Sequence, residues 1–125
     1  MKRHVLGLAV LLCASTACVT EQSRDLSGEG VACLDGATIK VDFQTCLSSS
    51  CDTLEGASCE AALSGDTIMV TSAATVVSDS GASACTADCG LATTSCAVTG
   101  GDASAATTIS YAGSETTELG CTDPF

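Results

Sequence analysis

The most regular alternation of apolar and polar residues lies in residues 38–44, with the sequence TIKVDFQ. Ile39, Val41 and Phe43 would share one face of a strand, and the polar residues between them would share the other. A period of two is typical of a strand that buries one face. The preceding Asp35-Gly36 pair is typical of a hairpin turn. We therefore expect a half-buried strand that starts from a hairpin.

The longest apolar-rich run beyond the N-terminus covers residues 65–77, with the sequence GDTIMVTSAATVV. Its small-residue step at residues 72–74 favours two short strands joined by a tight connection. Shorter patterns predict further strands and a turn near the C-terminus, namely strands at residues 96–98 and 107–111, a turn at 112–114 and a returning segment at 116–121.

The segments on either side of the central run are rich in Ser, Gly and Cys. Residues 46–64 and 78–90 are therefore predicted to be cross-linked loops, although residues 53–63 could hold a helical turn. Together the patterns predict a mostly β fold, in the form of a small disulfide-stapled domain that is β-sandwich-like or a double hairpin.

The cysteine spacing indicates a tandem duplication over residues 46–84 and 85–121. Each half would contain three cysteines, a Gly-Asp pair and a closing cysteine nineteen positions after the Asp. The first set of landmarks is Cys46, Cys51, Cys59, Gly65-Asp66 and Cys85, and the second is Cys85, Cys89, Cys96, Gly101-Asp102 and Cys121. Coincidence in a cysteine-dense chain is the alternative interpretation.

Residues 1–17 contain the three parts of an export signal. Lys2, Arg3 and His4 form a positive end, residues 5–12 form an apolar run, and residues 14–17 are small. The apolar run is much shorter than the about 20 residues that a spanning helix needs. We therefore expect residues 1–17 to be a cleaved signal peptide.

The segment LLCASTAC, which ends at Cys18, resembles the signal of bacterial lipoprotein precursors. In that family a small residue precedes a cysteine that is lipidated and becomes the first mature residue. The resemblance implies that Cys18 is lipidated and that the protein is held at a membrane through this N-terminal lipid. Val19 stands where lipoproteins of the inner membrane usually have Asp, which implies outer-membrane sorting if the cell is Gram-negative.

Ordinary secretory cleavage is the alternative, because residues 15–17 also satisfy the small-x-small rule for that cleavage. The cysteine count helps to separate the two. If Cys13 leaves with the signal and Cys18 carries lipid, eight cysteines remain and all can pair. A free Cys18 would leave one thiol unpaired, so the count favours lipidation.

Residues 20–30 are polar and contain glycine, and we expect residues 18–30 to comprise the lipidated cysteine and a flexible tether ahead of a Cys-rich β domain at residues 31–125. That domain has few large side chains for a core, because the chain contains no Trp, one Tyr and two Phe. Small exported domains with thin cores are commonly cross-linked, which implies an oxidising, extracytoplasmic compartment. The residues expected to form disulfides are Cys33, Cys46, Cys51, Cys59, Cys85, Cys89, Cys96 and Cys121.

The duplication suggests a pairing rule in which the third cysteine of each copy joins the first cysteine of the next. The rule predicts the bridges Cys33–Cys46, Cys59–Cys85 and Cys96–Cys121, and it leaves Cys51 to pair with Cys89. The rival arrangement has local loops, closed by Cys46–Cys59 and Cys85–Cys96.

The net charge of −11 argues against nucleic-acid partners. Lys2 and Arg3 lie in the signal, so Arg24 and Lys40 are the only cations that oppose fifteen acidic residues in the rest of the chain. Binding to nucleic acid depends largely on Lys and Arg that neutralise phosphates. The acidity is more simply explained by solubility.

Catalytic residues are not expected, since the only histidine, His4, lies in the signal. Its removal excludes nucleophile–histidine pairs. Lys40 could serve a Ser-Lys dyad, but its place on the polar face of a strand favours an exposed lysine. A hydrolase that uses paired carboxylates stays open as a lesser alternative, although the chain has few aromatic residues to form a sugar platform.

We expect no cofactor and no metal centre. Cys85, Cys89 and Cys96 lack the second close pair that is typical of structural zinc sites. Weak calcium binding stays an alternative, because four aspartates lie at glycine-adjacent or loop positions, although none belongs to a spaced calcium loop. These are Asp35, Asp66, Asp88 and Asp102.

The sequence thus predicts a non-enzymatic, lipid-anchored protein of the cell envelope or cell surface, with a structural or binding role. A freely secreted inhibitor or toxin-like protein is the alternative, which would follow if Cys18 carried no lipid.

Overall fold

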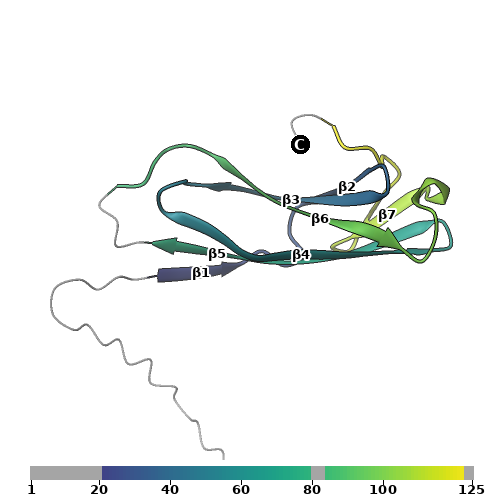
Figure 1. Ribbon diagram of the computed structural model, residues 1–125, viewed down its shortest axis with the longest axis horizontal. Coiled ribbons are helices and arrows are strands. Elements are labelled where there is room, and N and C mark those ends of the chain that lie inside the picture. The colour runs from purple at the N-terminus through teal and green to yellow at the C-terminus, as the bar shows by residue number, and fades with distance from the viewer. Residues whose placement is uncertain (1–20, 80–83, 123–125) are drawn as a thin grey trace, which may run out of the picture.

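The computed structural model describes residues 21–79 and 84–122, and within them the fold is mostly β (Figure 1). The strands are β1 Glu21–Asp25, β2 Val31–Asp35, β3 Thr38–Leu47, β4 Asp52–Ser64, β5 Thr67–Asp79, β6 Gly90–Thr99, β7 Thr108–Tyr111 and β8 Ser114–Thr116, with a short 3-10 helix at Ala103–Ala105.

A single curled sheet makes both layers of the domain. Its strand order is β2-β3-β6-β4-β5-β7-β8, and β1 adds to β5 outside this path. The first part of β6 pairs antiparallel with β3, and its last residues run parallel to β4, at Val98 opposite Ala61. Strand β6 therefore passes from one layer to the other, so that β2 and β3 lie over β4 and β5 with the core between them (Figure 1).

Three hairpins have two-residue turns of the kind that matches strand twist. They lie at residues 36–37, 65–66 and 112–113, between paired strand ends. Gly36 and Gly65 have positive φ at the first turn position, and Ala112 and Gly113 have positive φ at both positions. These conformations define the primed turns that favour tight hairpins. The expected hairpin at Asp35-Gly36 and the turn near residue 112 are confirmed.

The alternation in residues 38–44 is also confirmed, because Ile39, Val41 and Phe43 are buried in β3. The expected break in residues 65–77 is wrong, since β5 is one continuous strand of 13 residues. Every second side chain of β5 faces the core, including those of Ser72 and Ala74, so the small residues continue the alternation and do not end the strand.

The loop expected at residues 46–64, with its helical turn, is wrong for most of its length. Residues 52–64 form β4, which pairs with β5 along almost its whole length. The pairing shifts register between Glu55 and Ser58, and Gly56 there has a φ of 61°. Such a bulge interrupts the alternation on which a sequence-based strand prediction depends. The strand is stabilised by its partners and not by its own pattern.

The ordered domain begins earlier than expected, because residues 21–30 are not a free tether. Strand β1 pairs with the end of β5, and Leu26 is fully buried in the core. The Leu26 backbone N–H donates to the Ala74 carbonyl at 2.9 Å. Gly30 then passes so close to β3 that a Cβ atom would lie 1.9 Å from the Asp42 carbonyl oxygen. The prediction of a tether is wrong for residues 21–30 because their one large apolar residue, Leu26, stands among polar ones and gives no pattern.

All eight cysteines of the described residues form disulfides, but with different partners from those expected. The bridges are Cys33–Cys121, Cys46–Cys89, Cys51–Cys85 and Cys59–Cys96. The four predicted pairs are therefore wrong, and so are the local loops of the rival arrangement. The reason is the place of β6 between β3 and β4, which brings Cys89 beside β3 and Cys96 beside β4.

The two halves of the predicted duplication lie side by side as parallel strands. Strand β6 runs parallel to β4, and β7 runs parallel to β5. Residues paired across β4 and β6 are 37 positions apart, as are Cys59 and Cys96. Residues paired across β5 and β7 are instead 41 positions apart, as Thr67 and Thr108 are, so the two pairings do not share one offset and the duplication stays a prediction.

Adjacent residues of β5 provide a test of the core. The side chain of Ile68 is fully buried, whereas Met69 is 50% exposed on the opposite face. We expect Ile68→Ala to lower the free energy of unfolding by about 2–5 kcal/mol, because it leaves a cavity in a small core. Met69→Ala should change it by less than about 0.5 kcal/mol. Urea titration of the oxidised proteins measures both, and equal losses would contradict the inward assignment of Ile68.

Reduction should unfold the domain. The bridges join residues 34 to 88 positions apart, so each should contribute about 4 kcal/mol by limiting the unfolded chain. Four such contributions exceed the about 5–15 kcal/mol by which small domains are usually stable. We expect the far-UV circular dichroism and the thermal midpoint to collapse after complete reduction. An unchanged midpoint would show that the core holds the fold without its bridges.

Candidate functional site

The curled sheet has an open seam where its first and last strands, β2 and β8, approach each other. The seam is closed at one end, because the Leu34 backbone N–H donates to the Leu119 carbonyl at 2.6 Å and Cys33 is bonded to Cys121. At the other end the strands separate around a pocket. The seam is therefore a fork, joined at the Leu34 end and open at the Gly30 end.

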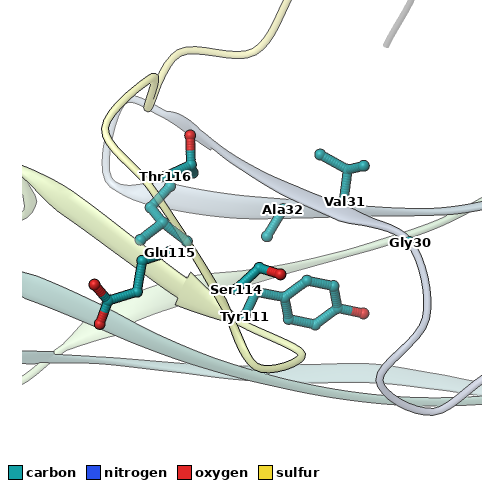
Figure 2. Close-up of a pocket in the computed structure, with 8 residues that line it drawn as sticks. Gly30, Val31, Ala32, Tyr111, Ser114, Glu115 and Thr116 are labelled. Carbon is teal, nitrogen blue, oxygen red and sulfur yellow. The ribbon is translucent and has the colours of Figure 1, made fainter.

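The pocket at the open end has a volume of about 250 Å³. Its lining residues come from the start of β2, from β7 and from β8, and they are Gly30, Val31, Ala32, Ile109, Tyr111, Ser114, Glu115 and Thr116. Figure 2 shows Glu115 and Thr116 on one side and Gly30 and Val31 on the other. Ile109 and Tyr111 are buried, so the pocket reaches the edge of the hydrophobic core.

Tyr111 connects the pocket to the segment that leads into β2. Its hydroxyl donates to the Glu29 carbonyl at 2.5 Å. The same hydroxyl oxygen then accepts from the Ser72 hydroxyl, 2.6 Å away. The Gly28 backbone N–H donates to the same Ser72 oxygen at 3.2 Å. Figure 2 shows the ring with its hydroxyl directed toward the chain at Gly30. The wall of the pocket is thus held in place by three linked hydrogen bonds.

Backbone groups on both sides of the seam point into it. In an antiparallel pair the residues next to a two-residue turn are hydrogen-bonded to each other, and the direction of bonding then alternates along the strand. Counting from Asp35 opposite Thr38, the N–H and C=O of Ala32 point away from β3. Counting from Tyr111 opposite Ser114, those of Glu115 point away from β7. Within the described residues, no backbone bond crosses the seam at either position.

The glutamates around the seam are exposed. Glu115 lines the pocket and Glu29 precedes β2, whereas Glu118 adjoins Leu119 at the closed end. The two cations of the described chain are engaged elsewhere: Arg24 donates to the Thr45 hydroxyl, and Lys40 forms an ion pair with Asp35 at 3.0 Å. The carboxylates at the seam therefore have no cation beside them.

The four aspartates considered for calcium are separated and have local roles. Asp35 pairs with Lys40, Asp66 accepts from the Thr107 hydroxyl, Asp88 accepts from the Ser49 N–H, and Asp102 caps the 3-10 helix. No group of three or more His, Cys, Asp or Glu side chains is close enough to hold a metal ion in residues 21–79 and 84–122. None of these four residues lines the pocket at the open end of the seam.

The lipidation candidate, Cys18, and the signal at residues 1–17 lie outside the described residues. None of the helical residues described in the structure forms a segment long and apolar enough to cross a bilayer. The fold and the seam define a small, disulfide-bonded β domain. No protein-family model, no curated protein and no solved structure matches the chain.

The seam residues were not singled out from the sequence. The alternation in residues 107–111 places Ile109 and Tyr111 on one face, which is the available signal for a shared surface. Nothing in the sequence indicated that Tyr111 reaches Glu29, 82 positions away.

The carboxyl group of Asp52 ties the start of β4 to its surroundings. It accepts from the Ser78 hydroxyl at 2.6 Å and from the Ser48 N–H at 2.7 Å. The bond from Ser78 has the larger effect and that from Ser48 the next largest, and together they hold the pKa of Asp52 below its ordinary value of 3.8. A lowered folded-state pKa contributes stability above the unfolded-state pKa, and that contribution is lost as the pH falls through the folded-state value.

We therefore expect Asp52→Ala to lower the thermal midpoint at neutral pH and to have a smaller effect as the pH falls below 3.8. Glu60→Ala, the control, removes an exposed carboxylate from the same strand and should change the thermal midpoint little, both at neutral pH and below pH 3.8. Thermal melts from pH 2 to 7 measure both variants, and a deficit for Asp52→Ala that does not depend on pH would contradict the role of its charge.

Proposed function

We propose that this chain is a non-enzymatic, lipid-anchored protein of the bacterial cell envelope, with a binding role. Cys18 carries the lipid, and the β domain is displayed outside the cytoplasm, on the outer membrane if the cell has one. The observation that carries the proposal is the position of β1, because this strand starts at Glu21, only three residues after Cys18.

The short connection would hold the domain close to the membrane. Three residue steps of about 3.3–3.6 Å keep the Cα atoms of Cys18 and Glu21 within about 11 Å of each other. Glu21 lies opposite Asp79 at the end of β5, and the Asp79 N–H donates to the Cys51 carbonyl. The end that contains the start of β1 and the Cys51–Cys85 bridge would therefore face the membrane.

The strands that form the seam would lie in the other half of the domain. Figure 1 places the start of β1 toward the left, and β2 and β7 toward the right. A pocket lined by β2, β7 and β8 is then accessible from the outside while the lipid holds the opposite end. This geometry supports a binding role for the displayed surface.

The chemistry of the pocket favours binding over hydrolysis. Its polar side chains are hydroxyls, and Glu115 is its only carboxylate. A hydrolase that acts through paired carboxylates needs two of them on either side of the bond that it cleaves. The four disulfides support an oxidising compartment.

Fatty-acid labelling tests the anchor. Cells that express the full chain with labelled palmitate should incorporate label into the wild-type protein and into Cys13→Ser, but not into Cys18→Ser. The Cys13→Ser variant is the matched control, because its cysteine would leave with the signal. The wild-type protein should sediment with membranes, whereas Cys18→Ser should not.

An unlabelled wild-type protein in the culture medium would overturn the proposal. It would favour the alternative of a freely secreted inhibitor or toxin-like protein.

A further inference from the structure

We propose that the Cys46–Cys89 bridge is a site of reversible S-thiolation, at which a low-molecular-weight thiol exchanges with the disulfide while the domain stays folded. The incoming thiolate forms an S–S bond to the sulfur of Cys89, the Cys46–Cys89 bond breaks, and Cys46 leaves as a thiolate with the electron pair of that bond. Attack on Cys46 releases Cys89 in the same way. One disulfide replaces another, so no oxidant or further reductant is needed. This site does not depend on the lipid anchor, and the two proposals stand or fall separately.

The exposure of both cysteines supplies the first reason. An attacking thiolate needs access to one sulfur, and the other sulfur must leave as a charged thiolate, which burial disfavours. Among the four bridges of the described residues, Cys46–Cys89 is the one in which both members are exposed. The other bridges pair buried Cys33 with half-buried Cys121, buried Cys51 with exposed Cys85, and half-buried Cys59 with half-buried Cys96.

The Cys51–Cys85 bridge shows why one exposed member is not enough. Cys85 is open to attack, but the leaving group would then be Cys51, which is only 7% exposed. A thiolate that is poorly solvated is a poor leaving group. Attack in the other direction would have to reach the buried Cys51. We therefore expect this bridge to persist under conditions in which Cys46–Cys89 exchanges.

Hydrogen bonds beside the bridge supply the second reason, because they do not depend on it. The Thr86 backbone N–H donates to the Ser50 hydroxyl at 2.9 Å, and the Ser49 N–H donates to the Asp88 carboxylate at 3.2 Å. These bonds join the segment that leads to Cys89 to the segment that follows β3. The two segments would therefore stay together after exchange.

The Cys51–Cys85 bridge also limits how much Cys46–Cys89 adds to stability. Cys46 lies five positions before Cys51, and Cys89 lies four positions after Cys85. In an unfolded chain that keeps Cys51–Cys85, the Cys46–Cys89 bridge closes only a short loop through it, and short loops stabilise less than long ones. Opening this bridge alone should leave the domain folded, in contrast with complete reduction.

Exchange should loosen one end of the ladder between β3 and β6. The register of this pairing shifts just before Cys46, and beyond the shift the residue pairs are Cys46 opposite Leu91 and Leu47 opposite Gly90. The Cys46–Cys89 bridge cross-links this short end of the ladder. Its opening should let these pairs separate more often, while the long pairing of β4 with β5 is unchanged.

Thiol treatment of the exported, oxidised Cys18→Ser chain tests the proposal. This chain lacks the cysteine that would remain outside the four bridges after signal cleavage, so each free thiol comes from an opened bridge. The probe is mercaptoethanol, an uncharged small thiol. Samples taken over time are quenched with an excess of N-ethylmaleimide. Non-reducing peptide mapping by mass spectrometry then locates each free thiol and each mixed disulfide.

The first free thiols and mixed disulfides should appear at Cys46 and Cys89. The initial rate there should exceed that at any other bridge by about tenfold or more, because either sulfur can be attacked and either can leave as a solvated thiolate. The far-UV circular dichroism should not change, and amide hydrogen exchange should rise at Leu47 and Leu91 but not in β4. After gel filtration removes the probe from an unquenched sample, the released thiolate should expel the bound thiol and restore the bridge.

The double variant Cys46→Ser/Cys89→Ser is the matched control, since it keeps the other three bridges. It should have the circular dichroism spectrum of the parent chain and should incorporate no probe over the same time. A variant that does not fold would contradict the claim that the remaining contacts hold the domain.

Three further results would overturn the proposal. One is earlier modification of any other bridge, and another is no modification of Cys46–Cys89 before the domain loses its circular dichroism signal. The third is simultaneous opening of all four bridges, which would show that exchange requires unfolding.

Discussion

The structure depends on cross-links between segments that are distant in sequence, because the two layers enclose little apolar volume. Five of the buried core residues are alanines, namely Ala32, Ala61, Ala74, Ala92 and Ala103. Such side chains allow the layers to approach closely but bury little surface each. The shortest bridge, Cys51–Cys85, spans 34 positions and the longest, Cys33–Cys121, spans 88. Each bridge therefore removes many conformations from the unfolded chain, and this stabilisation does not depend on burying large apolar side chains.

Local patterns in the sequence predicted the elements that carry their own signal. The alternation around Ile39, Val41 and Phe43 identified β3, and Asp35-Gly36 identified its hairpin. Strand β4 could not be identified in this way, because its bulge at residues 55–58 interrupts the period and its residues are mostly small. The break predicted in its partner β5, at residues 72–74, has a similar cause. Small side chains that face the core give no hydrophobic signal, even where they continue the alternation of the strand.

The disulfide pairing could not be predicted from spacing because it depends on which strands become neighbours. The predicted rule assumed that the chain links each copy to the next in sequence, whereas β6 crosses back and lies against both β3 and β4. The observed bridges Cys46–Cys89, Cys51–Cys85 and Cys59–Cys96 still treat the two copies alike. Exchange of the copies converts the first bridge into the second and leaves the third unchanged. These three bridges are thus symmetric under exchange of the two segments, but they join different pairs of cysteines from those that the rule predicted.

The seam follows from the strand order, which is also the reason that the predicted disulfide pairs are wrong. Because β2 and β8 come from opposite ends of the chain, no local pattern could show that they meet. The Cys33–Cys121 bridge fixes the two edges together at one end, and the bond from Tyr111 to Glu29 supports the wall at the other. A complete strand ladder between β2 and β8 would close the path of strands from β2 to β8, and β1 would remain an edge strand beside β5. The seam is therefore joined at one end, by the Leu34–Leu119 hydrogen bond and the Cys33–Cys121 bridge, and it holds a pocket at the other.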